Sequence, residues 1–355
     1  MSNPFADDLH EILLRVAGWL PDDMLTSARV LLADDRCGEV ARLLVFAGRR
    51  TVLPLTEDNL DVLTELLESE GADVSSLALV ELAADNASLL WRFSAERDEP
   101  AEGEQDDETG HAILISALAE QDLLAAVAEE PGLRGLWSAV RTPVDGAPYP
   151  PARVVYVAEV DDEHEDAGSP AEITGRLQAT LLAAGERDPQ LEVVSIHRGK
   201  PAYQYAAQTR GKVLWAAEPE LEVKVARVFD KVDPEAGPSF APDRPKIEQQ
   251  EERDRILDYL ETGTRLLVTA ARLQDVVQPD RGAAVPTNFY TDGKWVWTDS
   301  ISYYLEQYHL APDPELLEHI DAVDGPPPRP DTIALGRAME ALTPSEEKQP
   351  VWTSS

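Results

Sequence analysis

Two carboxylate–histidine pairs stand at helical spacing towards the C-terminal end of the 355-residue chain. Glu306 and His309 are three residues apart, and Glu315 and His319 are four residues apart. Each spacing places both side chains on one face of a helix, where a carboxylate and an imidazole could bind a divalent metal if two such faces converged. The apolar residues beside them occupy the inward faces, so we expect surface contacts within each helix and no metal site.

Other ionisable candidates follow two predicted strands. Residues 161–166 contain five carboxylates and one histidine, but they lack the glycine and the ligand order of a calcium loop, so a solvated loop is expected. His197 closes the second strand and could act as an acid or a base, but the sequence indicates no carboxylate that would orient it. Cys37, the only cysteine, lies among Leu and Val in a predicted helix and is expected to be buried.

The sequence also lacks the short motifs that identify common enzymes. It has no phosphate-binding G-x-x-x-x-G-K-[ST] loop, no G-x-G-x-x-G after a strand and no G-x-S-x-G nucleophile elbow. We therefore predict no catalytic residue, no metal ligand and no cofactor. The alternative is an enzyme with an unrecognised site between the sheet and the C-terminal hairpin. Its first candidate residues would be Asp299, Tyr303, His309 and His197.

The stretch 287–320 is the richest in aromatic residues. Asp292-Gly293 between two β-prone runs predicts a β-hairpin with a type I′ turn, in which both central residues need positive φ. Helical spacing follows the hairpin, and Asp313-Pro314 begins a further helix. The aromatic side chains either form a packed core or line a recognition surface. The candidate binding residues are Tyr290, Trp295, Trp297, Tyr303 and Tyr304.

The net charge of −36 limits the classes of partner. It opposes non-specific binding to nucleic acid, which requires clustered Lys and Arg, and it disfavours anionic membrane surfaces. It favours long-range attraction of a basic protein. Residues 1–150 carry 30 acidic and 10 basic side chains, more than half of the excess. No apolar run reaches the roughly 18 residues of a membrane span, and the N-terminus lacks the pattern of a secretory signal, so the cytoplasm is expected.

Periodicity predicts an α+β multidomain protein: an N-terminal helical domain, a central β-α-β-β sheet domain and a C-terminal β-hairpin plus helices. Residues 133–140 are expected to be helical, as the continuation of the helix before them. The predicted divisions are a helical domain at 1–95, an acidic linker at 96–109, a helical connector at 110–145, a sheet domain at 146–232, a linker at 233–245, a helix, hairpin and helices domain at 246–325, and a proline-rich break, short helix and disordered tail at 326–355.

These properties favour a non-catalytic protein that binds a basic protein partner. An immunity or antitoxin-like role in a bacterial cytoplasm would suit an acidic protein, since opposite charges accelerate association with a basic toxin domain. A structural or scaffolding subunit is a further alternative, in which the face carrying Trp295 and Trp297 contacts a second copy or another chain. No nucleic acid and no membrane are expected as partners.

Overall fold

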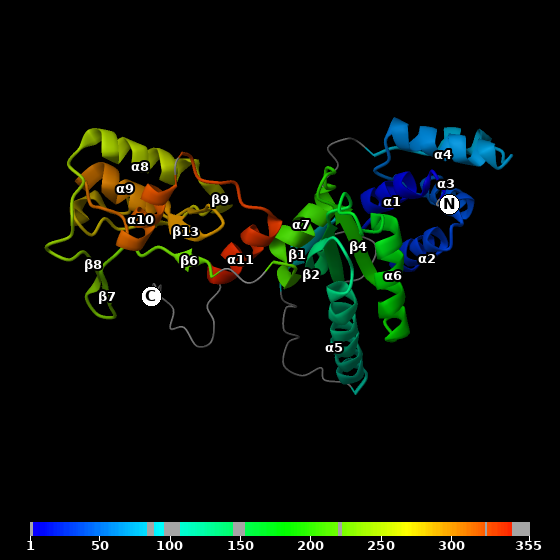
Figure 1. Cartoon of the computed structure of the whole chain (residues 1–355), viewed down its shortest axis with the longest axis horizontal. Coiled ribbons are helices and arrows are strands. Elements are labelled where there is room, and N and C mark those ends of the chain that lie inside the picture. Colours follow the sequence, from blue (N-terminus) through cyan, green and yellow to red (C-terminus); the bar gives the residue numbers. More distant parts are fainter. Residues whose placement is uncertain are drawn as a thin grey trace. The chain divides into compact units, whose positions relative to one another are not determined.

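The computed structural model describes residues 3–83, 89–95, 107–144, 153–218, 222–323 and 325–342, with side chains from 118 onward in the third range. The chain divides into two compact units, Met1–Pro219 and Glu220–Ser355 (Figure 1). Both units combine helices with small sheets, so the predicted α+β class is confirmed. The predicted boundaries at 95 and 145 fall within the first unit, and the finer division remains a prediction.

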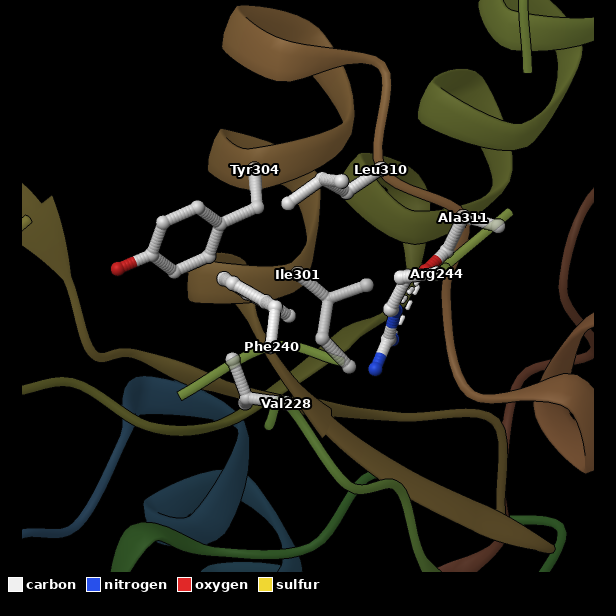
Figure 2. Close-up of a pocket in the computed structure, with 7 residues that line it drawn as sticks. All are labelled: Val228, Phe240, Arg244, Ile301, Tyr304, Leu310 and Ala311. Carbon is white, nitrogen blue, oxygen red and sulfur yellow. Dashed lines mark hydrogen bonds between the residues drawn. The ribbon is translucent and has the colours of Figure 1, made fainter. Parts of the chain in front are cut away.

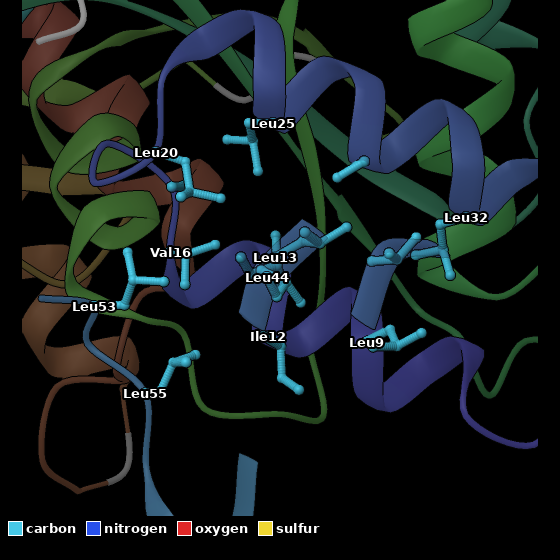
Figure 3. Packing of buried hydrophobic residues seen from close by; sticks show 14 of the residues in the cluster. Leu9, Ile12, Leu13, Val16, Leu20, Leu25, Leu32, Leu44, Leu53 and Leu55 are labelled. Atoms are coloured by element: carbon cyan, nitrogen blue, oxygen red, sulfur yellow. The ribbon is translucent and has the colours of Figure 1, made fainter. Parts of the chain in front are cut away.

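Four amphipathic helices and a short 3-10 helix open the first unit. Leu9, Ile12, Leu13 and Val16 repeat at helical spacing and are fully buried, and they pack with leucines of the next helices in one apolar cluster (Figure 3). This part agrees with the predicted N-terminal helices. The elements are α1 (Ala6–Arg15), α2 (Asp22–Ala33), α3 (Cys37–Gly48), α4 (Glu57–Ser69) and η1 (Ser75–Leu79).

A five-stranded sheet forms the centre of the first unit. The strand order is β1-β2-β3-β4, and β5 pairs with another part of β2. Strands β3 and β4 are parallel, and the other pairs are antiparallel. The strands are β1 (Trp91–Ser94), β2 (Leu133–Pro143), β3 (Arg153–Val160), β4 (Gln190–Ser195) and β5 (Lys212–Ala216).

The helix predicted at residues 133–140 was wrong, because this segment belongs to strand β2. Residues 133–141 pair with β3 on one side, and residues 135–138 pair with β5 on the other. Seven consecutive residues from 135 to 141 are buried, which removes the period of two by which a half-exposed strand is identified. The segment is therefore a central strand whose conformation depends on partners distant in the sequence.

Helices cover both faces of this sheet. On one face, α5 (Asp107–Ala128) and α6 (Pro170–Ala183) enclose an apolar cluster with β2, β3 and β4. On the other face, α7 (Ala202–Arg210) packs against β1, β2 and β3 and joins the cluster of the N-terminal helices. Ser169 and Glu172 form a capping box at the start of α6. The observed order from β3 to β5 is β-α-β-α-β, so the predicted β-α-β-β order lacked the helix α7.

Buried ion pairs connect the N-terminal helices to the sheet. Arg29 of α2 lies 2.7 Å from Glu192 of β4, and both side chains are 2% exposed. Arg141 of β2 lies 2.7 Å from Asp22 at the start of α2. A charge removed from water in this way needs its partner, so these contacts fix how α2 sits on the sheet.

The second unit is built on a four-stranded sheet of order β6-β13-β12-β9. Its centre is the predicted hairpin of β12 and β13, followed by the predicted helices. The strands are β6 (Lys224–Val225), β7 (Lys231–Asp233), β8 (Gly237–Ser239), β9 (Thr264–Leu267), β10 (Arg272–Leu273), β11 (Val285–Pro286), β12 (Phe289–Thr291) and β13 (Trp295–Thr298). The helices are α8 (Gln250–Thr262), η2 (Pro279–Arg281), α9 (Asp299–Tyr308), α10 (Pro314–Ala322) and α11 (Thr332–Leu342).

The hairpin turn differs from the predicted type I′. Gly293 has a φ of 92°, but Asp292 does not take positive φ. The pairing of Thr291 with Val296 leaves four residues in the connection. The Asp292 side chain accepts hydrogen bonds from the N–H groups of Lys294 and Trp295, so a side chain stabilises this turn.

The segment predicted as a linker at 233–245 is folded. It contains β8, which pairs with β7, and Phe240 packs at 4.8 Å from the ring of Tyr304. Proline, glycine and aspartate are frequent here because the segment turns tightly. Phe240 is partly buried against the apolar cluster of the second unit, so the segment packs on the body of that unit.

Candidate functional site

The ends of strands β3 and β4 bring together two groups that lie apart in the sequence. Val160 and Ser195 are paired in the parallel register and are the last residues of their strands. The acidic loop 161–166 follows β3, and His197 follows β4. Loops at the carboxyl ends of parallel strands commonly form ligand sites in open α/β sheets, so this edge is the candidate site.

A histidine–aspartate pair forms at this edge. His197 Nε2 donates to Asp161 Oδ1 at 2.8 Å. The hydroxyl of Ser195 donates to Asp162 Oδ1 at 2.6 Å and accepts a hydrogen bond from the backbone N–H of His197 at 3.0 Å. The orienting carboxylate that the sequence did not indicate is therefore Asp161. It escaped notice because 36 residues separate it from His197, and only the parallel pairing joins them.

Electrostatics strengthens this pair. The hydrogen bond to Asp161 is the main cause of a raised His197 pKa, with the carboxylates of Glu163, Asp161 and Asp162 adding to it. The same hydrogen bond is the main cause of a lowered Asp161 pKa. The two side chains are 39% and 30% exposed, so a ligand in solution can reach both.

The surroundings of the pair are acidic and partly apolar. Glu163, Glu165 and Asp166 are exposed, and Ile196 exposes 40% of its surface beside His197. Glu11 of α1 lies 3.2 Å from Arg198 and reduces the positive charge of the β4–α7 loop. The edge can therefore contact a cationic group through carboxylates and an apolar group through Ile196.

The same geometry does not position a nucleophile. Ser195 is 2% exposed, and its hydroxyl donates to Asp162 while the His197 ring donates to Asp161. Serine catalysis would require the ring to accept the hydroxyl proton. Within the described parts of the chain, no three His, Cys, Asp or Glu side chains are arranged to hold a metal ion.

The aromatic candidates lie mainly in the core of the second unit. Trp297 is fully buried, and its indole N–H donates to the Leu260 carbonyl at 3.0 Å. Tyr303 is half-buried, and its hydroxyl donates to Asp275 at 2.9 Å. The remaining three are buried: Tyr290, Trp295 and Tyr304. This burial agrees with the packed-core interpretation, and binding by these five residues remains a prediction.

The two carboxylate–histidine pairs do not form contacts within their helices. Glu315 lies 2.6 Å from Lys224, and His319 turns to Asp292, with Nε2 2.5 Å from Oδ2. His309 lies 3.3 Å from Glu248. The expectation of contacts between residues of the same helix was wrong, because residues from other elements approach these histidines more closely.

Asp292 is a buried acceptor that the sequence did not reveal. One of its oxygens accepts the two N–H groups of the turn, and the other accepts the Tyr259 hydroxyl at 2.7 Å and faces His319. Burial raises the pKa of Asp292, but these hydrogen bonds, led by the one from Tyr259, lower it by more than burial raises it. The pKa of Asp292 is therefore below its usual range. The side chain fastens the hairpin to α8 and α10.

The residues proposed for an enzyme site in the second unit have separate partners. Asp299 accepts hydrogen bonds from Asn288 at 2.9 and 2.7 Å, and burial raises its pKa. Tyr303 bonds Asp275, and His309 contacts Glu248. The structure therefore gives each of these three side chains a different hydrogen-bond partner.

A pocket in the second unit is lined by mostly apolar residues (Figure 2). Arg244 crosses one side and donates to the Ala311 carbonyl at 2.8 Å. The empty volume of the pocket is about 170 Å³ even with open solvent included, whereas ligand pockets typically enclose about 300–1,000 Å³. The pocket beside Tyr304 is therefore smaller than a typical ligand pocket.

Among the described helices, none is both long and apolar enough to cross a membrane. Comparison of the chain with protein-family models, with curated proteins and with solved structures found no match.

Proposed function

We propose that the chain is a non-catalytic protein that binds a basic protein partner through the loops that follow β3 and β4. The observation that supports this most directly is the exposed acidic loop 161–166 beside the partly exposed Ile196. Interfaces combine a central apolar contact with a polar rim, and complementary charge at the rim accelerates association. The loop would surround Ile196 with carboxylates that attract Lys and Arg.

The overall charge supports the same choice of partner. At −36, the chain repels acidic proteins and nucleic acids over the distance of a Debye length, about 8 Å at physiological salt. A basic protein is attracted before contact, which suits rapid neutralisation. We propose an immunity or antitoxin-like role in the cytoplasm, with a basic toxin domain as the partner.

Charge reversal at the loop tests the proposal. Affinity capture from the native host at low salt should return a strongly basic protein, and binding to that protein is then measured for variants. Reversal of Glu163, Glu165 and Asp166 to lysine should weaken binding about tenfold or more, mainly through slower association. Added salt should reduce the wild-type association rate.

A matched control separates this site from net charge. Glu251, Glu252 and Asp254 are exposed on α8, and their reversal to lysine changes the net charge by the same amount. The control should bind with nearly wild-type affinity. Equal loss in both variants would contradict a site at this loop, and capture of no basic protein would contradict the binding function.

A further inference from the structure

The titratable ring of His197 occupies Asp161, one of the carboxylates to which the proposed basic partner would bind. Its Nε2 donates to Asp161 at 2.8 Å and lies 4.0 Å from Glu163 Oε2. An incoming guanidinium or ammonium group that binds Asp161 must therefore compete with the His197 ring. Because both side chains are partly exposed, the ring can move away without opening the core.

We propose that His197 is a proton-dependent competitor for the partner's cationic side chains, so that protonation of this one histidine weakens binding at the edge of β3 and β4. The inference rests on the proposed function and adds a mechanism of regulation to it. A protonated ring neutralises Asp161, whereas a neutral ring retains only a hydrogen bond.

The charged groups around His197 favour this behaviour. The β3–α6 loop contributes Asp161, Asp162 and Glu163, all of which attract the protonated ring. On α1, Glu11 lies 3.2 Å from Arg198 and forms an ion pair with it. On β2, Arg134 lies close enough to Asp161 to attract it, but its guanidinium is paired with Glu218 at 2.6 Å.

The direction of the effect follows from proton linkage. In the free protein the His197 pKa is raised above its ordinary value, mainly by the hydrogen bond to Asp161. When a partner cation takes Asp161, that stabilisation is lost and the pKa falls, so binding releases a proton. Affinity should consequently rise as the pH increases through the range in which free His197 loses its proton.

An octa-arginine peptide provides a probe that keeps its own charge throughout this range. Its affinity for the full chain should be severalfold weaker at pH 6 than at pH 8.5, because the protonated ring holds Asp161 against the peptide. His197→Gln should remove most of this pH dependence and should strengthen binding at pH 6. NMR of the wild type should show the His197 pKa falling when the peptide binds.

His164 supplies the matched control, because it is an exposed histidine in the same acidic loop. His164→Gln should keep the wild-type pH dependence. Binding with an unchanged pH slope in His197→Gln would contradict the competitor role alone. Failure of the peptide to bind either wild type or His197→Gln at pH 8.5 would contradict the proposed cation site as well.

Discussion

The two units each contain a histidine–aspartate pair at hydrogen-bond distance, 2.8 Å in the first and 2.5 Å in the second, but the pairs differ in burial. In the first unit, Asp161 and His197 are 30% and 39% exposed, and their hydrogen bond closes two adjacent loops. In the second, Asp292 is fully buried, and His319 is 17% exposed. The buried pair has a further donor in Tyr259 and two backbone N–H groups. The same two residue types therefore form an exposed contact between loops in the first unit and a buried contact within the core of the second.

Burial decides which pair stabilises the fold. Removing a buried acceptor leaves its donors with neither a protein partner nor water to bond to. The free energy of unfolding then falls by the full desolvation cost of those donors. An exposed pair exchanges its partners for water with little loss. We infer that Asp292–His319 is structural and that Asp161–His197 is free to exchange partners.

Loss of the buried carboxylate should have the largest effect. Asp292→Ala leaves two turn N–H groups and the Tyr259 hydroxyl without their acceptor, and should lower the stability of the second unit by about 3 kcal/mol or more. Hydrogen exchange of residues 289–298 measures this directly. Asp258→Ala, at an exposed position on α8, should leave exchange unchanged. Similar exchange in both variants would contradict the structural role of Asp292.

Protonation of a buried histidine gives the next largest effect. His10 is buried, its Nε2 donates to the Val193 carbonyl at 2.8 Å, and burial lowers its pKa to about 4. The unfolded chain therefore binds this proton more readily than the folded chain between about pH 6.5 and 4. Its stability contribution is present above pH 6.5 and is lost as the pH falls, by about 2 kcal/mol near pH 4.5.

Urea unfolding from pH 7 to 4.5 checks the His10 prediction. Burial is the main cause of raised pKa values at Glu11 and Glu192, and these two groups act in the opposite direction as the pH falls. The comparison is therefore the difference between wild type and His10→Gln, which cancels those groups. If the difference in unfolding free energy between the two proteins does not change with pH, folding does not lower the His10 pKa and the prediction is wrong.

Removal of one donor from the buried pair should have a smaller effect. Tyr259→Phe deletes the hydroxyl that donates to Asp292 at 2.7 Å and retains the ring that packs on Trp297. The carboxylate keeps its other partners, so the stability of the second unit should fall by about 1 kcal/mol. Exchange of the hairpin amides should accelerate less than in Asp292→Ala, and an equal or greater acceleration would contradict this order.

The exposed pair should show the smallest effect on stability. Asp161→Asn should leave the urea midpoint of the first unit unchanged, because both groups can bond to water instead. The His197 pKa should nevertheless fall toward its ordinary value, since the hydrogen bond that His197 donates to Asp161 is the main cause of its raised value. NMR titration of His197 in both proteins measures that change. A large loss of stability would place Asp161 with the structural pairs.

Local sequence was sufficient for much of the secondary structure. Periodicity predicted the N-terminal helices, where Leu9, Ile12, Leu13 and Val16 have helical spacing, and Asp292-Gly293 predicted a hairpin. These signals are local because helices repeat every 3.6 residues and tight turns need particular residues. The excess of carboxylates is also a property of the sequence alone, and it predicts attraction of a basic partner.

Tertiary structure decided the features that depend on distant neighbours. Strand β2 pairs on both sides, and burial of seven consecutive residues removed the alternation that would have distinguished it from a helix. The parallel register of β3 and β4 placed Asp161 beside His197, and the packing of α8 and α10 placed Tyr259 and His319 on Asp292. Sequence spacing carries no measure of such contacts, because a folded chain brings together side chains that are tens of residues apart.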